Sequence, residues 1–500
     1  MSYLPPCWSR DRGDGRATDR SCRCRRGRPT PRSGGSVICR TQRFTPLVLA
    51  AALATGGCGS DDDKSCDVAR QTGCGTGLVC EPVEGGRSVC AQPVVISGNV
   101  FDLATAMGIE KARVVALDAN RSPISTVAIT DAAGDFSIQV SNPRTRDGAP
   151  VARDVFLRAD AQGYATFPSG IRQALPVNTA GGVSLDGKLV VADPQTTDVG
   201  LIEIPSAGTG TISGTAAVPA NQPGVLVVAE TADGQAFSAL ADRNGDYAIF
   251  NLAPGDYSVR AYARGAVHPA ASAAVIADQV TDVDLAMGGN ATGTVSGQVQ
   301  VVNPGTGKET SVILVVESTF DEALARGETP PGLRAPEAGA PSITGAWQIT
   351  GVPPGRYVAL AAFENDLLVR DPDVCISGTD IQHLEVVAGV PTGAVDFKVT
   401  GALDVISPGA NGPELLTTAT PKLVWEDDSS EDAYEITIVD AFGVPVFPEP
   451  VIIAGASGGN PEYQVVDPLP PGYYQFKVKS AKAGCYLSQT EDLKGVFIVP

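Results

Sequence analysis

A short motif occurs three times in the chain and restricts its fold more than any other feature. The copies "VISGNV" (95–100), "TISGTA" (211–216) and "TVSGQV" (294–299) each place Ser-Gly inside a strand-like segment. Each is followed further along by a turn and a second alternating segment: "TDAAGDFSIQV", "ADRNGDYAIFNLAPGDYSV" and "TGAWQITGVPPGRYVAL". Repeats of this kind mark consecutive structural units. The sequence therefore predicts three modules built from short strands and turns.

The length and composition agree with a multi-module β protein. At about 150 residues per domain, 500 residues suggest about three to four domains. Only 19% of the residues are charged, while 56 Gly and 38 Pro separate runs rich in Val, Ile and Thr. That pattern favours strands over long helices. We therefore predict an all-β fold of tandem β-sandwich modules, preceded by a signal segment and a small disulfide-rich module.

The turn in "DRNGDYAI" offers acidic residues that suggest calcium binding. Asn244 and Gly245 supply the positive φ of a tight hairpin turn, after which Tyr247 begins an alternating strand. An EF-type loop requires Gly at position 6 and Glu at position 12. Counted from Asp242, those positions hold Tyr247 and Ala253. The register fails, so we interpret the segment as a hairpin turn and predict no metal site.

The three units resemble carboxypeptidase regulatory-like domains, which are transthyretin-like seven-stranded β-sandwiches. The likeness covers Pro93 to Thr400 and is most specific in the second unit. The first unit lacks the "PPG-Y" element, and "DEALARGETPPGLRAPEAGAP" interrupts the third. The zinc-binding catalytic domain of those peptidases is absent, so the resemblance does not imply peptidase activity. Closely related carbohydrate-binding-like sandwiches share the pattern, which leaves the ligand open.

The last hundred residues carry a different pattern. "PKLVWEDDSSEDAYEITIVDAFGVPVF" and "LPPGYYQFKVKSAKAG" resemble a fibronectin type III module. This resemblance places Trp425 in an early core strand and turns Tyr474, Phe476 and Val478 inward.

The segment before the repeats has the features of an export signal. Arg40 and Arg43 precede the apolar run "PLVLAAALA" (46–54), and small residues then lead to Cys58. Such an order is typical of a secretory signal, and the run is too short to span about 30 Å of hydrocarbon as a helix. It resembles a bacterial lipoprotein signal, which implies lipidation of Cys58. Thr55 stands where such signals usually have leucine, so simple secretion and an uncleaved segment remain alternatives.

Residues 1–36 fit no signal, because they are rich in Arg and Pro and contain scattered cysteines. We interpret them as a mis-set start, with translation beginning near Val37, or as a disordered basic head. Residues 37–57 are then the lipoprotein signal and 58–65 an acidic linker.

Cysteines define the next module, residues 66–92. Cys66, Cys74, Cys80 and Cys90 lie in a segment with few apolar side chains, so two disulfides are expected to replace a core. Four cysteines allow three pairings, and zinc binding is the rival interpretation. Two further cysteines, Cys375 and Cys485, are predicted to pair with each other. The alternatives are that both are buried, or that both pair with another molecule.

The sequence contains none of the catalytic motifs considered below. His268 and His383 are the only histidines, and neither lies in an H-E-x-x-H setting. "NPGTGKET" lacks the spacing of a phosphate loop, and no G-x-S-x-G elbow occurs. We predict neither catalysis nor a cofactor. Trp347 and Trp425 are expected in cores, which leaves Tyr262 and Tyr473 as possible glycan contacts.

Charge limits the partners. Residues 1–46 carry 11 Arg and 3 Asp, a net of +8, and because the whole chain is −19 the remainder stands at −27. Residues 47–500, with this negative charge, would repel the phosphate backbone of a nucleic acid, which argues against nucleic-acid binding.

These features predict a non-catalytic protein of the bacterial cell envelope, held by a lipid at the outer membrane, whose modules serve structural or adhesive contact. The expected partner is an envelope protein or polysaccharide. A carbohydrate-binding surface protein is the alternative, and a hydrolase accessory subunit is a third. The expected sandwiches are 93–206, 207–290, 291–400 and 401–500.

Overall fold

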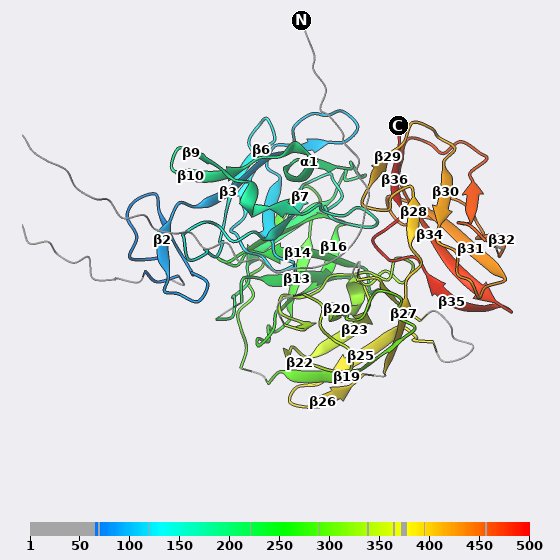
Figure 1. Cartoon of the computed structure of the whole chain (residues 1–500). Helices are drawn as coiled ribbons and strands as arrows, with labels where there is room; N and C mark the ends of the chain where they lie inside the picture. Colours follow the sequence, from blue (N-terminus) through cyan, green and yellow to red (C-terminus); the bar gives the residue numbers. More distant parts are fainter. Residues whose placement is uncertain are drawn as a thin grey trace, which may run out of the picture. The chain divides into compact units, whose positions relative to one another are not determined.

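The computed structural model describes residues 66–68, 71–119, 121–220, 222–289, 291–337, 340–363, 366–371, 378–394, 396–455 and 458–500. All of these lie in one compact unit, residues 63–500. Almost every regular element is a strand (Figure 1). The predicted all-β fold is confirmed. The predicted lipidation site, Cys58, lies outside the described residues.

The cysteine module contains one antiparallel hairpin, β1 (Val79–Glu81) and β2 (Val89–Ala91). It joins directly to the first sandwich, here called module 1.

Module 1 consists of two sheets. One has the order β11-β3-β10-β9 with β6 also paired to β3, and the other has the order β5-β4-β7-β8. Its elements are β3 (Val94–Asp102), β4 (Arg113–Leu117), β5 (Ala128–Ile129), β6 (Asp135–Val140), β7 (Asp154–Asp160), β8 (Val177–Asn178), η1 (Thr179–Gly181), β9 (Val183–Leu185), β10 (Lys188–Val191), α1 (Pro194–Thr197) and β11 (Val199–Leu201).

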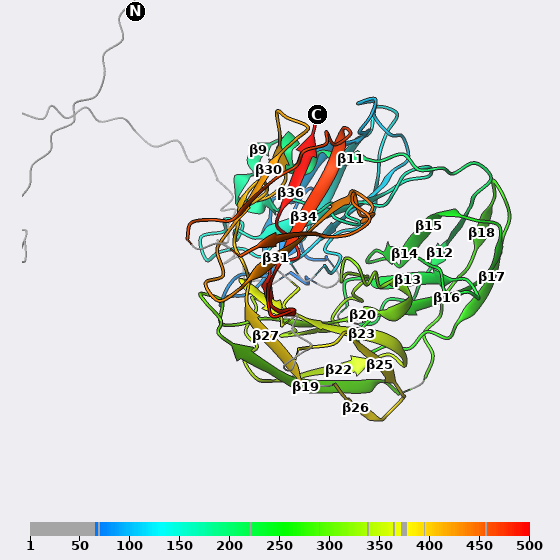
Figure 2. The ribbon, with the colours of Figure 1, turned by 90° about the vertical axis from the view of Figure 1, so that its right-hand side faces the viewer.

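Module 2 has a three-stranded sheet, β15-β12-β18, and a four-stranded sheet, β14-β13-β16-β17 (Figure 2). Its strands are β12 (Gly210–Thr215), β13 (Val225–Glu230), β14 (Ala236–Ala241), β15 (Asp246–Leu252), β16 (Gly255–Tyr262), β17 (Ala271–Val275) and β18 (Val280–Asp282).

Module 3 repeats this plan with the sheets β22-β19-β27-β24, to which β26 adds, and β21-β20-β23-β25. Its elements are β19 (Gly293–Val302), β20 (Val312–Val316), η2 (Glu317–Thr319), β21 (Arg334–Ala335), β22 (Ala346–Val352), β23 (Gly355–Ala361), β24 (Leu368–Arg370), β25 (Gln382–Val386), β26 (Pro391–Gly393) and β27 (Phe397–Gly401).

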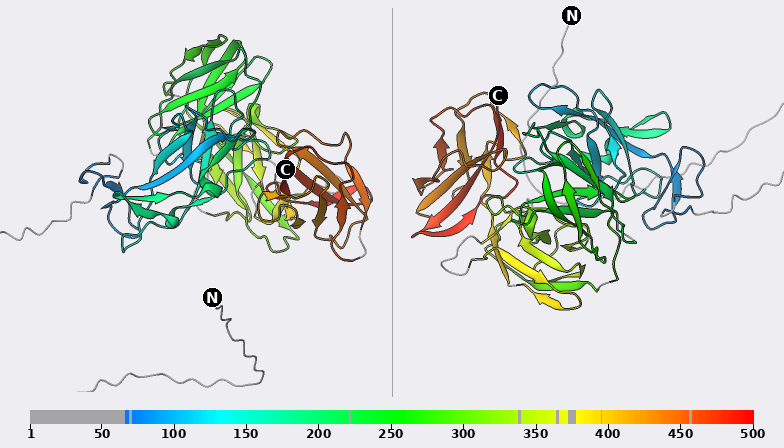
Figure 3. Two further views of the ribbon diagram at one scale, coloured as in Figure 1. Left: turned by 90° about the horizontal axis from the view of Figure 1, so that it is seen from above. Right: turned by 180° about the vertical axis from the view of Figure 1, so that it is seen from behind.

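The terminal module, orange to red in Figure 3, pairs a three-stranded sheet, β28-β30-β33, with a larger one, β29-β36-β34-β31-β32, to which β35 adds. Its strands are β28 (Val405–Ser407), β29 (Glu414–Leu415), β30 (Lys422–Trp425), β31 (Ala433–Asp440), β32 (Val451–Ala454), β33 (Glu462–Gln464), β34 (Gly472–Lys482), β35 (Cys485–Gln489) and β36 (Val496–Val499). Trp425, Phe476 and Val478 are fully buried in its core.

The repeated Ser-Gly motif has a steric cause. In each repeat the glycine lies directly opposite an aromatic residue on the neighbouring strand: the pairs are Gly98–Phe136, Gly214–Tyr247 and Gly297–Trp347. A Cβ on Gly297 would lie 2.9 Å from the Trp347 ring, and a Cβ on Gly214 would lie 2.1 Å from the Val283 carbonyl oxygen. At Gly297, the missing Cβ leaves room for the ring of Trp347, which is a core residue, 4% exposed; at Gly214, it leaves room for the neighbouring backbone.

Candidate functional site

Strand β13 of module 2 is buried on both faces. Val225 and Val227 point into the core of module 2. Leu226 and Val228 point the other way, into a second apolar cluster that contains most of the module 3 core, and they are 0% and 1% exposed. A sandwich standing alone would expose this outer face to water. Modules 2 and 3 therefore share a core.

Strand β4 of module 1 joins the same cluster. Val114 and Ala116 belong to the core of module 1, whereas Val115 and Leu117 belong to the shared cluster. The sequence predicted tandem modules but no burial between them. Residues of all three modules are in fact buried in one apolar cluster, which we call the shared core.

Tyr262 is part of the shared core. It is 5% exposed, its ring meets that of Tyr357 edge to face at 6.2 Å, and burial raises its pKa to about 12. The prediction of a glycan contact at Tyr262 is wrong, because a buried ring cannot stack on a sugar. Along β16, Tyr257 and Val259 belong to the core of module 2, and Ser258 and Arg260 on the other face are exposed. Tyr262, at the end of that other face, meets another module instead of solvent.

A cluster of polar side chains from all three modules forms a first junction between them. The Arg158 guanidinium, on β7 of module 1, donates to Glu328 of module 3 at 2.9 Å and to Asp160 at 3.2 Å. Ser238 of module 2 donates to the same Glu328 oxygen at 2.7 Å. Burial alone would lower the pKa of Arg158, but the two carboxylates outweigh it and hold that pKa above its usual value. Burial would raise the pKa of Glu328, but Arg158 and the hydrogen bond from Ser238 together outweigh it and the pKa is lowered.

A second junction ties the terminal module to module 1. The Arg172 guanidinium lies between the rings of Phe167, at 4.9 Å, and Tyr473, at 5.2 Å. Burial lowers the pKa of Arg172. Tyr473 also packs beside Ile171 and is half-buried. The contact with Arg172 covers part of its ring, and a glycan contact at Tyr473 stays a prediction.

Arg326 of module 3 enters the same region. Its guanidinium donates to the carbonyl oxygen of Gly170 at 2.8 Å and to that of Asp492 in the terminal module. Burial lowers its pKa to about 10. Both junctions thus use arginines whose partners come from other modules.

The polar residues considered for chemistry have structural partners. Asp242 is 2% exposed: its Oδ1 accepts the backbone N–H of Asn244 and Asp246, and its Oδ2 accepts that of Val127 in module 1. The acidic turn therefore caps itself and bridges two modules. His268 is buried with its Nε2 2.7 Å from the Ala217 carbonyl oxygen.

His383 is exposed, and its Nδ1 lies 2.7 Å from Glu317. Glu317 also pairs with Arg356. Neither this cluster nor the Asp242 turn brings a nucleophile beside a base.

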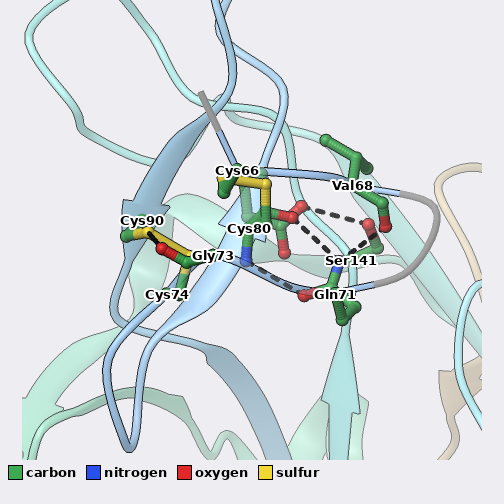
Figure 4. Close-up of a disulfide and its surroundings, with 9 residues drawn as sticks. Cys66, Val68, Gln71, Gly73, Cys74, Cys80, Cys90 and Ser141 are labelled. Atoms are coloured by element: carbon green, nitrogen blue, oxygen red, sulfur yellow. Dashed lines mark hydrogen bonds between the residues drawn. A yellow bond between two sulfur atoms is a disulfide. The ribbon is translucent and has the colours of Figure 1, made fainter. Parts of the chain in front are cut away.

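The cysteine module holds two disulfides, Cys66–Cys80 and Cys74–Cys90 (Figure 4). Among the described residues, the one group spaced for a metal ion is Cys66, Cys74 and Cys90, and all three are in these disulfides. Cys485 is also disulfide-bonded. Cys375 lies outside the described residues, so its pairing with Cys485 stays a prediction.

One module matches a known protein family. Residues 211–288 match the carboxypeptidase regulatory-like domain. This match covers the strands of module 2, the unit in which the sequence resemblance was most specific. No curated protein matches the chain. Within the described ranges, no helix is long and apolar enough to cross a membrane.

Similar solved structures include the Bacillus anthracis TIE protein, at 12% identity over 86% of this chain and 76% of that one, with a TM-score of 0.15. BcpA, the major pilin subunit of Bacillus cereus, is 10% identical over 61% of this chain and 99% of that one, with a TM-score of 0.17. A tetra-tandem repeat from the extending region of a large adhesion protein is 14% identical over 80% and 97%, with a TM-score of 0.14. Superpositions this loose carry no inference about function.

The arginines of both junctions were not predicted from the sequence, and Tyr473 was predicted only as a possible glycan contact. The shared core was not predicted either, although the sequence contains a signal for it. "VVAL" (114–117), "VLVVA" (225–229) and "VILVV" (312–316) are continuous apolar runs. Such runs are typical of strands buried on both faces, whereas a strand with one solvated face alternates.

Proposed function

We propose that this chain is a non-catalytic, lipid-anchored protein of the bacterial cell envelope that uses a fused block of β-sandwich modules for structural or adhesive contact. The observation that carries the proposal is the shared core of modules 1 to 3. Proteins that only present separate binding modules need no such burial between them.

The energetics favour a block without hinges. Fully burying a side chain such as Leu226 or Val228 contributes about 1.5 to 3 kcal/mol, so separating module 2 from its neighbours costs several such terms. Separation would also break the ion pair between Arg158 of module 1 and Glu328 of module 3. Relative motion of the modules is therefore suppressed, which suits a spacer that holds its outer surfaces at fixed positions.

The anchoring half of the proposal rests on the sequence around Cys58. The basic residues, the short apolar run and the small residues before this cysteine support lipidation and an outer-membrane location. The matched regulatory-like module brings no catalytic residues of its own, which supports the non-catalytic half.

Cells producing the chain test the proposal. Wild-type protein is expected to incorporate labelled palmitate, to fractionate with the outer membrane and to alter adhesion of the cells to surfaces or to one another. Cys58→Ser is expected to lose the label and to leave the membrane fraction. Labelling of both proteins would contradict the anchor, and unchanged adhesion and envelope integrity in a deletion strain would contradict the structural or adhesive role.

A further inference from the structure

The two disulfides of the cysteine module lie side by side (Figure 4). The Sγ atoms of Cys66, Cys74 and Cys90 all lie within 4.8 Å of one another, so one sulfur of the Cys66–Cys80 bridge is close to both sulfurs of the other bridge. Cys80 and Cys90 are also direct partners in the register of β1 and β2. Opposed residues of an antiparallel pair have Cβ atoms about 4.5 to 5.5 Å apart. Alternative pairings are therefore within reach of small movements.

We propose that these bridges form a thiol–disulfide exchange pair, in which a dithiol protein acting on Cys74–Cys90 converts the module to the pairing Cys66–Cys74 and Cys80–Cys90.

Burial decides where the exchange begins. Cys66 and Cys80 are 6% and 0% exposed, whereas Cys74 and Cys90 are half-buried beside the exposed residues 71–73 and 75–78. Exchange requires an attacking thiolate to reach a sulfur atom. An external dithiol therefore reaches the Cys74–Cys90 bridge first.

The chemistry balances in three steps. The dithiol reduces Cys74–Cys90 and becomes a disulfide itself, which leaves two thiols. The Cys74 thiolate then attacks Cys66 Sγ: the Cys66–Cys74 bond forms, the Cys66–Cys80 bond breaks, and the electron pair leaves on Cys80, which takes up a proton. The oxidised dithiol protein finally oxidises Cys80 and Cys90 to a disulfide and regains its thiols. The net reaction is an isomerisation that consumes neither oxidant nor reductant.

The isomer would release one segment. In the structure, both bridges tie residues 66–74 to the hairpin β1–β2. In the new pairing, Cys66–Cys74 lies within the first segment and Cys80–Cys90 within the hairpin, so no disulfide joins the two and only the backbone of residues 75–78 connects them. Gln71 would then hold the segment, through its hydrogen bonds at 2.9 Å to the Cys80 backbone N–H and carbonyl oxygen.

The hairpin itself would remain on module 1. Arg144 of module 1 donates its backbone N–H to the Pro82 carbonyl oxygen at 2.8 Å and accepts from Glu84 at 2.9 Å. Ser141 of module 1 donates to the buried Glu81 at 3.1 Å. The exchange thus frees the segment that precedes the hairpin while the sandwich block keeps its contacts.

Cys90→Ser in the full chain tests the exchange without any reductant, because it leaves a Cys74 thiol beside Cys66. After incubation at pH 8, acid quenching and alkylation, peptide mapping with a protease that cleaves after Leu78 separates Cys74 from Cys80. We expect a Cys66–Cys74 bond with alkylated Cys80. A preparation that holds only Cys66–Cys80 with alkylated Cys74 would overturn the proposal.

A second measurement covers the case in which that variant fails to fold. Wild-type protein is treated with a limiting amount of dithiothreitol, trapped over time and mapped in the same way. We expect Cys66–Cys74 and Cys80–Cys90 to appear. The double variant Cys66→Ala with Cys80→Ala keeps only the Cys74–Cys90 disulfide and should form no new disulfide. Loss of the original bridges without either new one would contradict the exchange.

Discussion

At the scale of single residues, the charged side chains that matter most pair across modules. Glu328 contacts Arg158 of module 1 and Ser238 of module 2. The Glu328 side chain is 30% exposed and the Arg158 side chain is 4% exposed. Removing a partner from a buried charge costs more than the pair contributes when it is intact. Glu328 is therefore the acidic residue whose loss should be felt in all three modules.

Glu328→Gln is expected to lower the free energy of unfolding by about 3 kcal/mol, the low end of the range for a broken buried pair, because Arg158 keeps Asp160. Urea denaturation measures the change. Glu322→Gln, at an exposed position of the same loop, is the matched control and should stay within about 0.5 kcal/mol of the wild type. Equal stabilities of the two variants would contradict a stabilising junction.

The same pair predicts a pH dependence. Since Arg158 lowers the pKa of Glu328, the folded state binds a proton at this site more weakly than the unfolded state does. Its contribution is present above the unfolded pKa of about 4.3 and is lost as the pH falls through the lower folded value. Below pH 4.3, the wild type should therefore lose stability relative to Glu328→Gln. Parallel stability curves for the two proteins between pH 5 and pH 2 would contradict this assignment.

At the scale of elements, the strands facing two cores and the Ser-Gly positions explain how the repeats are built. Alternation, turn residues and the motif predicted the all-β fold, and Trp347 and Trp425 were predicted as core residues. The burial of the outer faces of β4 and β13, and of Tyr262 at the end of β16, was not predicted, because an outward position looks the same in sequence whether water or another module covers it. Arg158 and Glu328 were beyond prediction, since residues 170 positions apart leave no local pattern.

Leu226→Ala tests the second face of β13. Although this side chain points away from the core of its own module, we expect a loss of about 2 to 5 kcal/mol, the cost of a large-to-small change in a core. Val280→Ala, at a side chain of the same module that is 63% exposed, should cost less than about 0.5 kcal/mol. Chemical denaturation followed by tryptophan fluorescence measures both. A neutral Leu226→Ala would show that the outer face is not a core.

Gly214→Ala tests the steric account of the motif. Its Cβ would meet a backbone carbonyl oxygen at 2.1 Å, and its φ of +153° is rarely adopted by residues with side chains. We expect it to lower the melting temperature more than Gly297→Ala, whose Cβ would meet a tryptophan ring able to shift. Gly393→Ala, where a Cβ meets nothing within 4 Å, is the control. An equal melting temperature for Gly214→Ala and Gly393→Ala would contradict the close approach.

At the scale of the whole molecule, the shared core and the junctions make the stability of each of modules 1 to 3 depend on its neighbours. The match to the regulatory-like family covers module 2 alone, yet module 2 contributes Leu226, Val228 and Tyr262 to a cluster dominated by module 3. Modules that share buried residues cannot open one at a time without exposing apolar surface. Their unfolding should therefore be coupled.

Hydrogen exchange measures this coupling. In Leu226→Ala, amides of β4 in module 1 and of β20 in module 3 should exchange faster than in the wild type, because both strands pack on the shared core. The terminal strand β36, whose buried residues belong to another cluster, serves as the internal reference. Faster exchange confined to module 2 would show that the modules open independently.

The double-faced strand β13 also has a practical consequence for anyone who divides the chain. A fragment cut at the limits of module 2 would expose Leu226, Val228 and Tyr262 to solvent as one apolar patch. Exposed apolar patches of this kind promote self-association. Such a fragment should precipitate or form oligomers, although its own sandwich is complete. The smallest soluble piece of this protein is thus expected to be larger than the repeat that its sequence displays.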